Sequence, residues 1–266
     1  MTAEAGPTRT PADLPSALER RREIERRIGD RRPVVFLDYD GVLTPIVERP
    51  EDATLSPDAR EALERLAGRV PVAVISGRDL EDVREMVGVE GIVFAGSHGF
   101  DIAGPEGLVE QRAVEALPRL DDAERALRQL ERVPGARIER KRFTVAVHYR
   151  QVDEDQVPEV EVEVERVAAD VGGLRVTGGK KVLELRPDVP WDKGRALLRL
   201  LEVLGLDGDD VVPIFIGDDV TDEDALRALP ERGIGIVVRG EEDDRATSAS
   251  YALADAGEVI AFLGTL

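Results

Sequence analysis

Residues 34–44 read Val-Val-Phe-Leu-Asp-Tyr-Asp-Gly-Val-Leu-Thr, an apolar run that ends abruptly in two carboxylates and a glycine. A continuous β-branched and aromatic run is typical of a strand buried on both faces of a parallel sheet. Asp38 and Asp40 then follow the carboxyl end of that strand, where ligands bind in open α/β sheets. Residues two apart share a face of extended chain, so the two carboxylates can point the same way. Their repulsion favours a bound cation or proton, and the alternative is a plain acidic loop.

Composition limits the classes of function. The chain has 266 residues, 42% hydrophobic and 34% charged, with a formal net charge of -19. This acidity disfavours nucleic acid as a partner and repels anionic membranes. The sequence has no cysteine, which excludes disulfides, thiol catalysis and thiolate metal sites. No apolar run approaches the ~20 residues of a membrane span, and the N-terminus has no apolar signal core, so we expect a cytoplasmic protein without a membrane segment.

Strand and helix patterns alternate over residues 33–109 and again over 188–266. Such alternation predicts an α/β fold, a doubly wound Rossmann-like parallel sheet with right-handed crossovers. The expected strands cover 33–37, 70–75, 91–95, 211–216, 234–238 and 251–253, and the expected helices cover 56–68, 79–87, 191–204, 221–229 and 258–263.

Residues 110–187 have a different pattern, which predicts a small α+β domain inserted into the first one. Alternating polar and apolar residues predict half-exposed strands, and a helix is expected at 120–133. For residues 155–171 we predict a helix, although their regularly spaced valines also suit a strand. Residues 1–32 are expected to be an N-terminal tail and a helix at 13–30. The expected strands of the insert cover 136–139, 143–149, 174–177 and 181–186.

Polar side chains follow several of the expected strands or open the next helix. Parallel strands share a carboxyl edge, so these side chains should gather at one edge of the sheet. Three acidic groups, a hydroxyl and a lysine in one cleft suit phosphoryl transfer. The candidates are Asp38 and Asp40, Ser76, Lys193, and the group Asp218, Asp219 and Asp222.

Each candidate has a chemical role in such a reaction. Mg²⁺ takes oxygen ligands, and Asp38 and Asp218 are the natural carboxylate pair for it. A free oxygen of Asp38 can attack phosphorus to form an aspartyl-phosphate. Asp40 can protonate the leaving alkoxide and then take a proton from water. Ser76 can bond a phosphoryl oxygen, and Lys193 supplies a fixed positive charge. Asp219 and Asp222 are expected to orient Asp218 and Lys193 rather than to bind the metal.

The order of these motifs resembles that of haloacid dehalogenase-type (HAD) phosphatases. Longer stretches narrow the resemblance to the trehalose-6-phosphate phosphatase family, over residues 33–264. The resemblance implies a Rossmann-like core, a mobile cap formed by the insert, Mg²⁺ dependence, and hydrolysis of trehalose 6-phosphate in trehalose biosynthesis. It also implies that the backbone carbonyl of Asp40 is a metal ligand. The stretches are Phe36–Gly41, Ile75–Arg78, Ala95–Ile102, Lys181–Pro187 and Ile216–Ala225.

Specificity for a disaccharide requires polar side chains that meet its hydroxyl groups. Lys180 and Glu184 match positions that contact sugar or phosphate in relatives. For three of the candidates a structural role is the alternative to substrate binding. Arg78 could bridge to a core carboxylate, His98 could make a hydrogen bond that stabilises its loop, and His148 could be an ordinary exposed histidine of a strand. The predicted substrate-binding residues are Arg78, His98, Lys141, His148, Arg150, Lys180, Glu184 and Arg186.

Two rival functions stay open from the sequence. One is a phosphatase of another sugar phosphate, such as sucrose 6-phosphate. The other is a non-catalytic regulatory domain of a sugar-synthase complex, although such a role would not need the intact Asp38, Asp40, Lys193 and Asp218. We expect a monomer that binds a small-molecule substrate, with trehalose-6-phosphate synthase as the functional partner that the resemblance implies.

Overall fold

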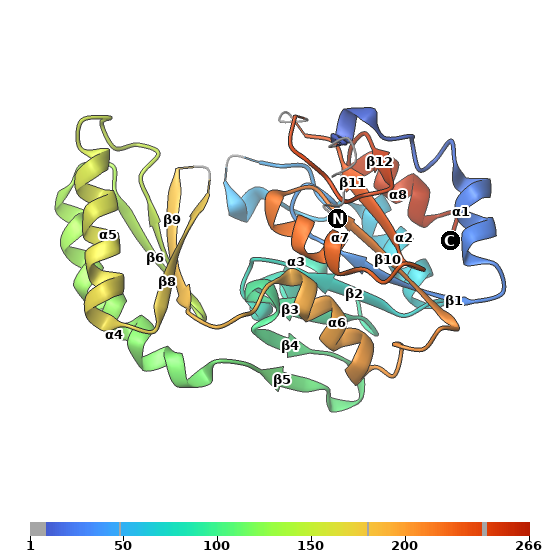
Figure 1. The fold of residues 1–266 in the computed structure, drawn as a ribbon, viewed down its shortest axis with the longest axis horizontal. Coiled ribbons are helices and arrows are strands. Elements are labelled where there is room, and N and C mark those ends of the chain that lie inside the picture. The colour runs from blue at the N-terminus through green and yellow to red at the C-terminus, as the bar shows by residue number, and fades with distance from the viewer. Residues whose placement is uncertain (1–8, 48, 180, 241–243) are drawn as a thin grey trace, which may run out of the picture. The chain divides into compact units, whose positions relative to one another are not determined.

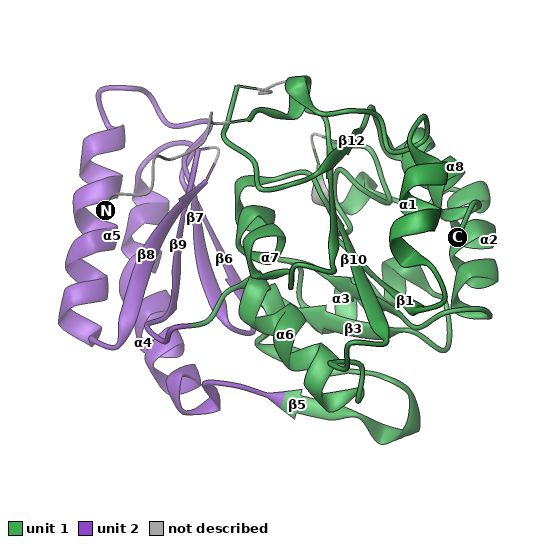
Figure 2. Ribbon diagram, turned by 45° about the vertical axis from the view of Figure 1, so that its right-hand side comes forward, with its two compact units in different colours: residues 1–110, 191–266 green, residues 111–190 purple. Residues whose placement is uncertain are grey.

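The computed structural model describes residues 9–47, 49–179, 181–240 and 244–266. Two compact units make up the fold, as Figures 1 and 2 show. The first comprises Met1–Glu110 with Trp191–Leu266, and the second comprises Gln111–Pro190. The second unit is therefore an insertion into the first.

The first unit is built on an eight-stranded sheet with the order β12-β11-β10-β1-β2-β3-β4-β5. β1 lies near the centre, parallel to β10 on one side and to β2 on the other. β3 pairs with β4 in the antiparallel direction. The strands are β1 (Arg32–Leu37), β2 (Val72–Ile75), β3 (Val93–Gly96), β4 (Asp101–Ala103), β5 (Val109–Gln111), β10 (Val211–Gly217), β11 (Ile234–Val238) and β12 (Tyr251–Leu253).

Two hydrophobic clusters cover the two faces of this sheet. Val35 and Leu37 pack in a cluster with apolar residues of α1, α2, α3 and α8. Val34 and Phe36 point the other way and pack with apolar residues of α6 and α7. The apolar run of β1 is continuous because both of its faces are buried. The helices are α1 (Arg21–Ile28), α2 (Pro57–Ala67), α3 (Leu80–Val87), α6 (Lys193–Val203), α7 (Glu223–Ala228) and α8 (Ala256–Leu263).

The second unit is a four-stranded antiparallel sheet with two helices on one face (Figure 2). Its core joins the apolar side chains of both helices to one face of the sheet. In α5 the buried valines Val160, Val164 and Val167 recur at helical spacing, whereas Val162 is 69% exposed. The segment is therefore a helix, as predicted, and the alternative of a strand is wrong. The elements are α4 (Leu117–Leu127), β6 (Arg137–Lys141), β7 (Thr144–His148), α5 (Val157–Val171), β8 (Leu174–Gly179) and β9 (Val182–Pro187).

The predicted α/β class and the doubly wound sheet are confirmed, with three differences in detail. β4 and β5, two short strands at the edge of the sheet, are not predicted from the sequence. The helix expected at 13–30 begins only at Arg21, after a 3₁₀ turn at Pro11–Asp13. The helix expected at 120–133 ends at Leu127 and continues as a 3₁₀ turn to Arg132. Every described helix is too short or too polar to cross a lipid bilayer.

Candidate active site

Asp38 follows β1 at the carboxyl edge of the central strands. Its backbone N–H donates to the carbonyl of Ile216 at 3.0 Å, which ties the end of β1 to β10. The register pairs Leu37 with Ile216, so Asp38 and Asp218 leave neighbouring strands at the same level. The parallel pairing thus brings together two carboxylates that are 180 positions apart in the chain.

Asp38, Asp218 and Asp222 form a carboxylate cluster. Each offers one oxygen, and these oxygens lie within 4.8 Å of one another. A Cβ atom at Gly41 would lie 2.1 Å from Asp218 Oδ2, and Gly41 has a φ of 74°, so only glycine fits there. Oxygen donors at this spacing are suited to a divalent metal ion. The cluster could therefore hold a metal ion, although its third member is Asp222 and not the predicted Asp40.

Lys193 is the cation of this cluster. It opens α6, and its side chain is only 3% exposed. Lys193 Nζ lies 2.7 Å from Asp38 Oδ2 and 2.7 Å from Asp222 Oδ1. Asp192 caps the same helix by accepting from the N–H of Arg195. The helix start thus delivers a fixed positive charge to the Asp38 carboxylate.

Asp222 organises the loop that follows β10. Its Oδ2 accepts from the backbone N–H groups of Asp218 and Asp219, at 2.9 and 3.0 Å. Its other oxygen accepts from Lys193, so both oxygens have protein donors. Asp219 is exposed, and its carboxylate accepts from the N–H of Val220 within the same turn. Asp222 therefore has the geometry of an orienting group, while Asp219 caps its own turn.

Burial and charge act in opposite directions on the pKa values of this cluster. Burial raises the pKa of the Asp38 carboxyl well above its ordinary value, against the effect of Lys193. Burial, followed by the charge of Asp222, raises the pKa of Asp218 to about 7. Burial would lower the pKa of Lys193, but the charges of Asp222 and Asp38 outweigh it and raise that pKa. One ammonium does not offset three carboxylates, which favours a bound cation.

Ser76 directly follows β2, the strand that pairs with β1. Its side chain is buried, and its Oγ accepts from the backbone N–H of Arg78 at 3.2 Å. The guanidinium of Arg78 donates two hydrogen bonds to Asp40, from Nε at 2.8 Å and from Nη2 at 2.6 Å. Arg78 thus bridges to the carboxylate that the sequence predicts as the acid–base group.

His98 stands in a strained turn after β3. Ser97 and His98 both have positive φ angles, 48° and 58°, which non-glycine residues adopt at a cost of about 1–3 kcal/mol each. The backbone N–H of His98 donates to the carbonyl of Ser76 at 2.8 Å. A Cβ at Gly77 would lie 2.9 Å from two atoms of the His98 ring. The turn therefore packs the imidazole against the loop that carries Ser76 and Arg78.

Four of the predicted substrate-binding residues of the insert share one face of its sheet. Register places Lys141 opposite Thr144, Arg137 opposite His148, and Glu184 opposite Ala146, while the other face packs on α4 and α5. On the shared face, His148 Nε2 lies 2.7 Å from Glu139 Oε2, and Arg186 donates to Glu184. Arg150 is exposed in the turn after β7, and Lys180 lies outside the described residues. The four on this face are Lys141, His148, Glu184 and Arg186.

Some neighbours of these sites are not predicted from the sequence. Arg245 donates to the carbonyl oxygen of Asp218, and Glu223 lies 3.9 Å from Arg245. Glu223 also accepts from the N–H of Ser248 at 2.8 Å. These contacts join the loop after β10 to a later loop. Their positions depend on long-range packing, which no local motif encodes.

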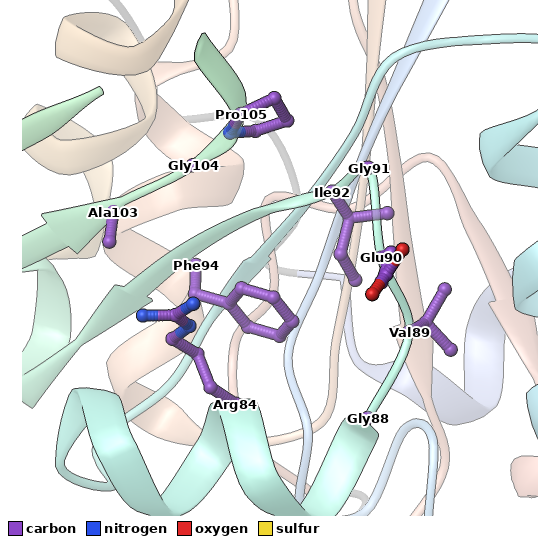
Figure 3. Close-up of a pocket in the computed structure, with 10 residues that line it drawn as sticks. All are labelled: Arg84, Gly88, Val89, Glu90, Gly91, Ile92, Phe94, Ala103, Gly104 and Pro105. Atoms are coloured by element: carbon purple, nitrogen blue, oxygen red, sulfur yellow. The ribbon is translucent and has the colours of Figure 1, made fainter. Parts of the chain in front are cut away.

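A separate pocket of about 400 Å³ lies at the amino end of β3 (Figure 3). Its walls are mostly apolar or backbone, with Val89, Ile92 and Phe94 on them, and its charged side chains are Arg84 and Glu90. The carboxylate cluster lies instead at the carboxyl ends of the strands, where α/β sheets bind ligands. The pocket of Figure 3 is therefore not part of the candidate active site.

Comparison with known proteins identifies the family. The family model described as trehalose-phosphatase matches residues 36–256 of this chain. The chain belongs to the trehalose-phosphatase family. Within it, the chain is 50% identical to a trehalose-phosphate phosphatase of Mycobacterium tuberculosis (strain ATCC 25618 / H37Rv) over 241 residues, 89% of this chain and 61% of that protein.

Two further proteins are similar to this chain. An uncharacterized glycosyl hydrolase of the same strain is 49% identical over 261 residues, 95% of this chain and 20% of that protein. The structure of Aspergillus fumigatus trehalose-6-phosphate phosphatase aligns with a TM-score of 0.66 and 30% identity, covering 94% of this chain and 97% of that one. Both curated relatives are longer, since this chain spans 61% of one and 20% of the other.

Proposed function

We propose that the chain is a Mg²⁺-dependent phosphatase that hydrolyses trehalose 6-phosphate to trehalose and phosphate. The observation that carries this proposal is the buried Asp38, held 2.7 Å from Lys193 inside a carboxylate cluster suited to a metal. The chain that carries these side chains is itself 50% identical over 241 residues to a trehalose-phosphate phosphatase. The similarity to that relative supports the proposed substrate and reaction. The residues of the site support the proposed chemical steps.

The donor set fits Mg²⁺, which prefers oxygen ligands and keeps several waters. We propose that Asp38, Asp218 and the backbone carbonyl of Asp40 hold it. When bound, the metal would neutralise charge on the carboxylates and on the transferred phosphoryl group. Asp222 is a weaker ligand candidate, because its two oxygens already accept from Lys193 and from two backbone N–H groups.

In the first half of the proposed reaction, an oxygen of Asp38 attacks the phosphorus atom. The bond between phosphorus and the sugar oxygen breaks as the aspartyl-phosphate forms. Asp40 gives its proton to that oxygen, so trehalose leaves as a neutral alcohol. Lys193 and Ser76 stabilise charge on the phosphoryl oxygens.

In the second half, water attacks the phosphorus of the aspartyl-phosphate. Asp40, now a carboxylate, takes a proton from this water as its oxygen bonds to phosphorus. The bond between phosphorus and the Asp38 oxygen breaks, which regenerates both carboxyl groups and releases phosphate. The polar surroundings hold Asp38 between turnovers, since Lys193 and the N–H of Tyr39 both donate to it.

We further propose that the open polar face of the insert's sheet binds the sugar. A disaccharide offers many hydroxyl groups, and recognition needs side chains that donate and accept. Glu184 and Arg186 present both kinds of group at adjacent positions on this face, and Lys141 and His148 add two more. Arg150, Lys180, Arg78 and His98 are the other residues that the sequence suggests for substrate contact. The insert would then act as a cap domain on the core.

The test is phosphate release from a panel of sugar phosphates, with Mg²⁺ and with chelator. The panel holds trehalose 6-phosphate, sucrose 6-phosphate, glucose 6-phosphate and an aryl phosphate. A strong Mg²⁺-dependent preference for trehalose 6-phosphate is expected. Preference for another sugar phosphate would replace the substrate but keep the chemistry. No release from any member by the folded protein would favour a regulatory domain of a sugar-synthase complex.

The raised pKa of Asp218 leads to a pH-dependent effect of Mg²⁺ on stability. Its folded value of about 7 exceeds the ordinary 3.8, so the metal-free protein loses stability as the pH rises through this window. Mg²⁺ binds the ionised carboxylates and offsets that loss. Saturating Mg²⁺ should therefore raise the Tm by several degrees more at about pH 8 than at about pH 5.5.

Thermal unfolding with and without Mg²⁺ at the two pH values checks this effect. The matched control is Asp218→Asn, which cannot ionise and should lose both the pH-dependent decrease and most of the Mg²⁺ increment. Equal Mg²⁺ increments at the two pH values in the unmodified protein would contradict the assignment of Asp218.

The cellular setting forms part of the proposal. We propose a cytoplasmic monomer that takes its substrate from a trehalose-6-phosphate synthase. The sequence has no cysteine, so the fold does not depend on disulfides and can form in a reducing compartment. Light scattering of the purified chain tests the oligomeric state, with a mass near 29.1 kDa expected.

A further inference from the structure

Arg78 and Asp40 form a forked ion pair beside the carboxylate cluster. Nε and Nη2 of Arg78 each donate to a different oxygen of Asp40, at 2.8 and 2.6 Å. We propose that Arg78 is a positioning residue, which acts on the reaction by fixing the Asp40 carboxyl for proton transfer. The inference rests on the proposed function, in which Asp40 is the acid–base group. Of the two roles that the sequence suggests for Arg78, it favours the bridge to a carboxylate over contact with the substrate.

Arg78 is the anchored member of this pair. Its side chain is 14% exposed, and its guanidinium lies over the Tyr39 ring, 5.4 Å from the ring centre. Tyr39 is itself buried and fixed, because its hydroxyl donates to the carbonyl of Ala53 at 2.6 Å. Nη1 of Arg78 lies 3.3 Å from the sulfur of Met86. The guanidinium therefore has a fixed place, which suits a support better than a group that must move with substrate.

Asp40 is the outward member of the pair. Its side chain is 44% exposed, and its carboxylate oxygens stand outside the cluster formed by Asp38, Asp218 and Asp222. A carboxylate has about four lone-pair sites, and Arg78 occupies one on each oxygen. The remaining sites can meet a sugar oxygen or a water while the fork stays intact. Arg78 can thus hold the rotamer of Asp40 through both halves of the reaction.

The forked ion pair with Asp40 also makes direct binding of the substrate by Arg78 less favourable. A guanidinium binds a phosphoryl group best through two parallel N–H groups. In Arg78 the Nε and Nη2 pair that would do so is already used by Asp40. A substrate contact through this edge would require the fork to open, and Nη1 on the other edge lies 3.3 Å from the sulfur of Met86. The geometry therefore favours action through Asp40.

Leaving-group dependence separates the two roles. General-acid catalysis contributes about 10²–10⁴-fold when the leaving group is a poor one, and much less for an activated aryl phosphate. Arg78→Ala is therefore expected to lower kcat/KM about 10- to 100-fold for trehalose 6-phosphate, and less than about 3-fold for the aryl phosphate. Arg78→Lys, which keeps one charged donor, should recover part of the loss. Arg84→Ala removes an exposed arginine of α3 as the matched control and should leave both values unchanged.

A double-mutant cycle with Asp40→Asn excludes a contact with the sugar. If Arg78 acts only through Asp40, then Arg78→Ala should change single-turnover rates on trehalose 6-phosphate less than about 3-fold in the Asp40→Asn background. It should also leave the Kd of trehalose 6-phosphate for Asp40→Asn unchanged, as measured by calorimetry. Circular dichroism of each variant verifies that it is folded.

Several results would overturn the inference. Equal losses on the two substrates would mean that Arg78 binds the phosphoryl group. A full further loss in the Asp40→Asn background, or a weaker Kd, would mean that it binds the sugar. Wild-type kinetics of Arg78→Ala would exclude any role. If the unmodified protein hydrolyses neither substrate, the proposed function fails first and the inference falls with it.

Discussion

Asp38→Asn is expected to abolish Mg²⁺-dependent phosphate release, with a loss of at least about 10⁴-fold in kcat. The amide cannot attack phosphorus, and it removes one carboxylate from the metal-holding cluster. The fold should survive, because an amide oxygen can still accept from the N–H of Tyr39, which now lies 2.7 Å from Asp38 Oδ1. Phosphate release from trehalose 6-phosphate at high enzyme concentration measures the loss.

The same substitution should stabilise the metal-free protein. Burial and two neighbouring carboxylates make ionised Asp38 unfavourable in the folded chain, as its raised pKa indicates. Replacing it by a neutral amide is expected to raise the free energy of unfolding by about 1 kcal/mol or more, roughly 2–4 °C in Tm. Asp209→Asn alters a fully exposed carboxylate and serves as the control. Appreciable turnover by Asp38→Asn would contradict its role as the nucleophile.

Lys193→Met is expected to have the largest effect on stability. The substitution leaves Asp38, Asp218 and Asp222 without their ammonium partner, and removing one member of a buried ion pair costs about 3–5 kcal/mol. The Tm should therefore fall by about 6–20 °C. Activity should also disappear, since the charge on Asp38 and on the phosphoryl group is no longer offset. Thermal unfolding and phosphate release are the two measurements.

Two controls separate charge from packing at Lys193. Arg65→Met breaks an exposed ion pair on α2 and should cost less than about 1 kcal/mol. Lys193→Met combined with Asp222→Asn removes a carboxylate as well as the ammonium, so it should regain part of the Tm but no activity. If Lys193→Met alone unfolds at the wild-type temperature, the ammonium does not balance the cluster.

Much of the site could be predicted because the sequence pattern indicates where buried strands end. The apolar run before Asp38 and the run before Asp218 each mark a buried parallel strand, and parallel strands place their ends at one edge. Lys193 could be found in the same way, as the start of a helix after the insert. The short edge strands β4 and β5 were missed, because segments of three residues carry too little periodicity.

The sequence suggested a bridge from Arg78 to a core carboxylate as one alternative, but it could not identify the partner, nor most other contacts between distant side chains. That Arg78 meets Asp40 depends on how the loops after β1 and β2 pack around the Tyr39 ring. That Asp222 holds two backbone N–H groups and Lys193 at once depends on the turn after β10. Arg245 reaches the carbonyl of Asp218 from a loop that carries no motif.

From the sequence we could predict the order of the longer strands and helices, the inserted unit and the residue types at each strand end. These depend on local periodicity and on composition, which short stretches of chain encode. The tertiary structure alone decided which charges meet, how deeply they are buried and hence which pKa values shift. Those quantities depend on distances of a few ångströms between segments far apart in the chain, where the low dielectric makes each contact strong.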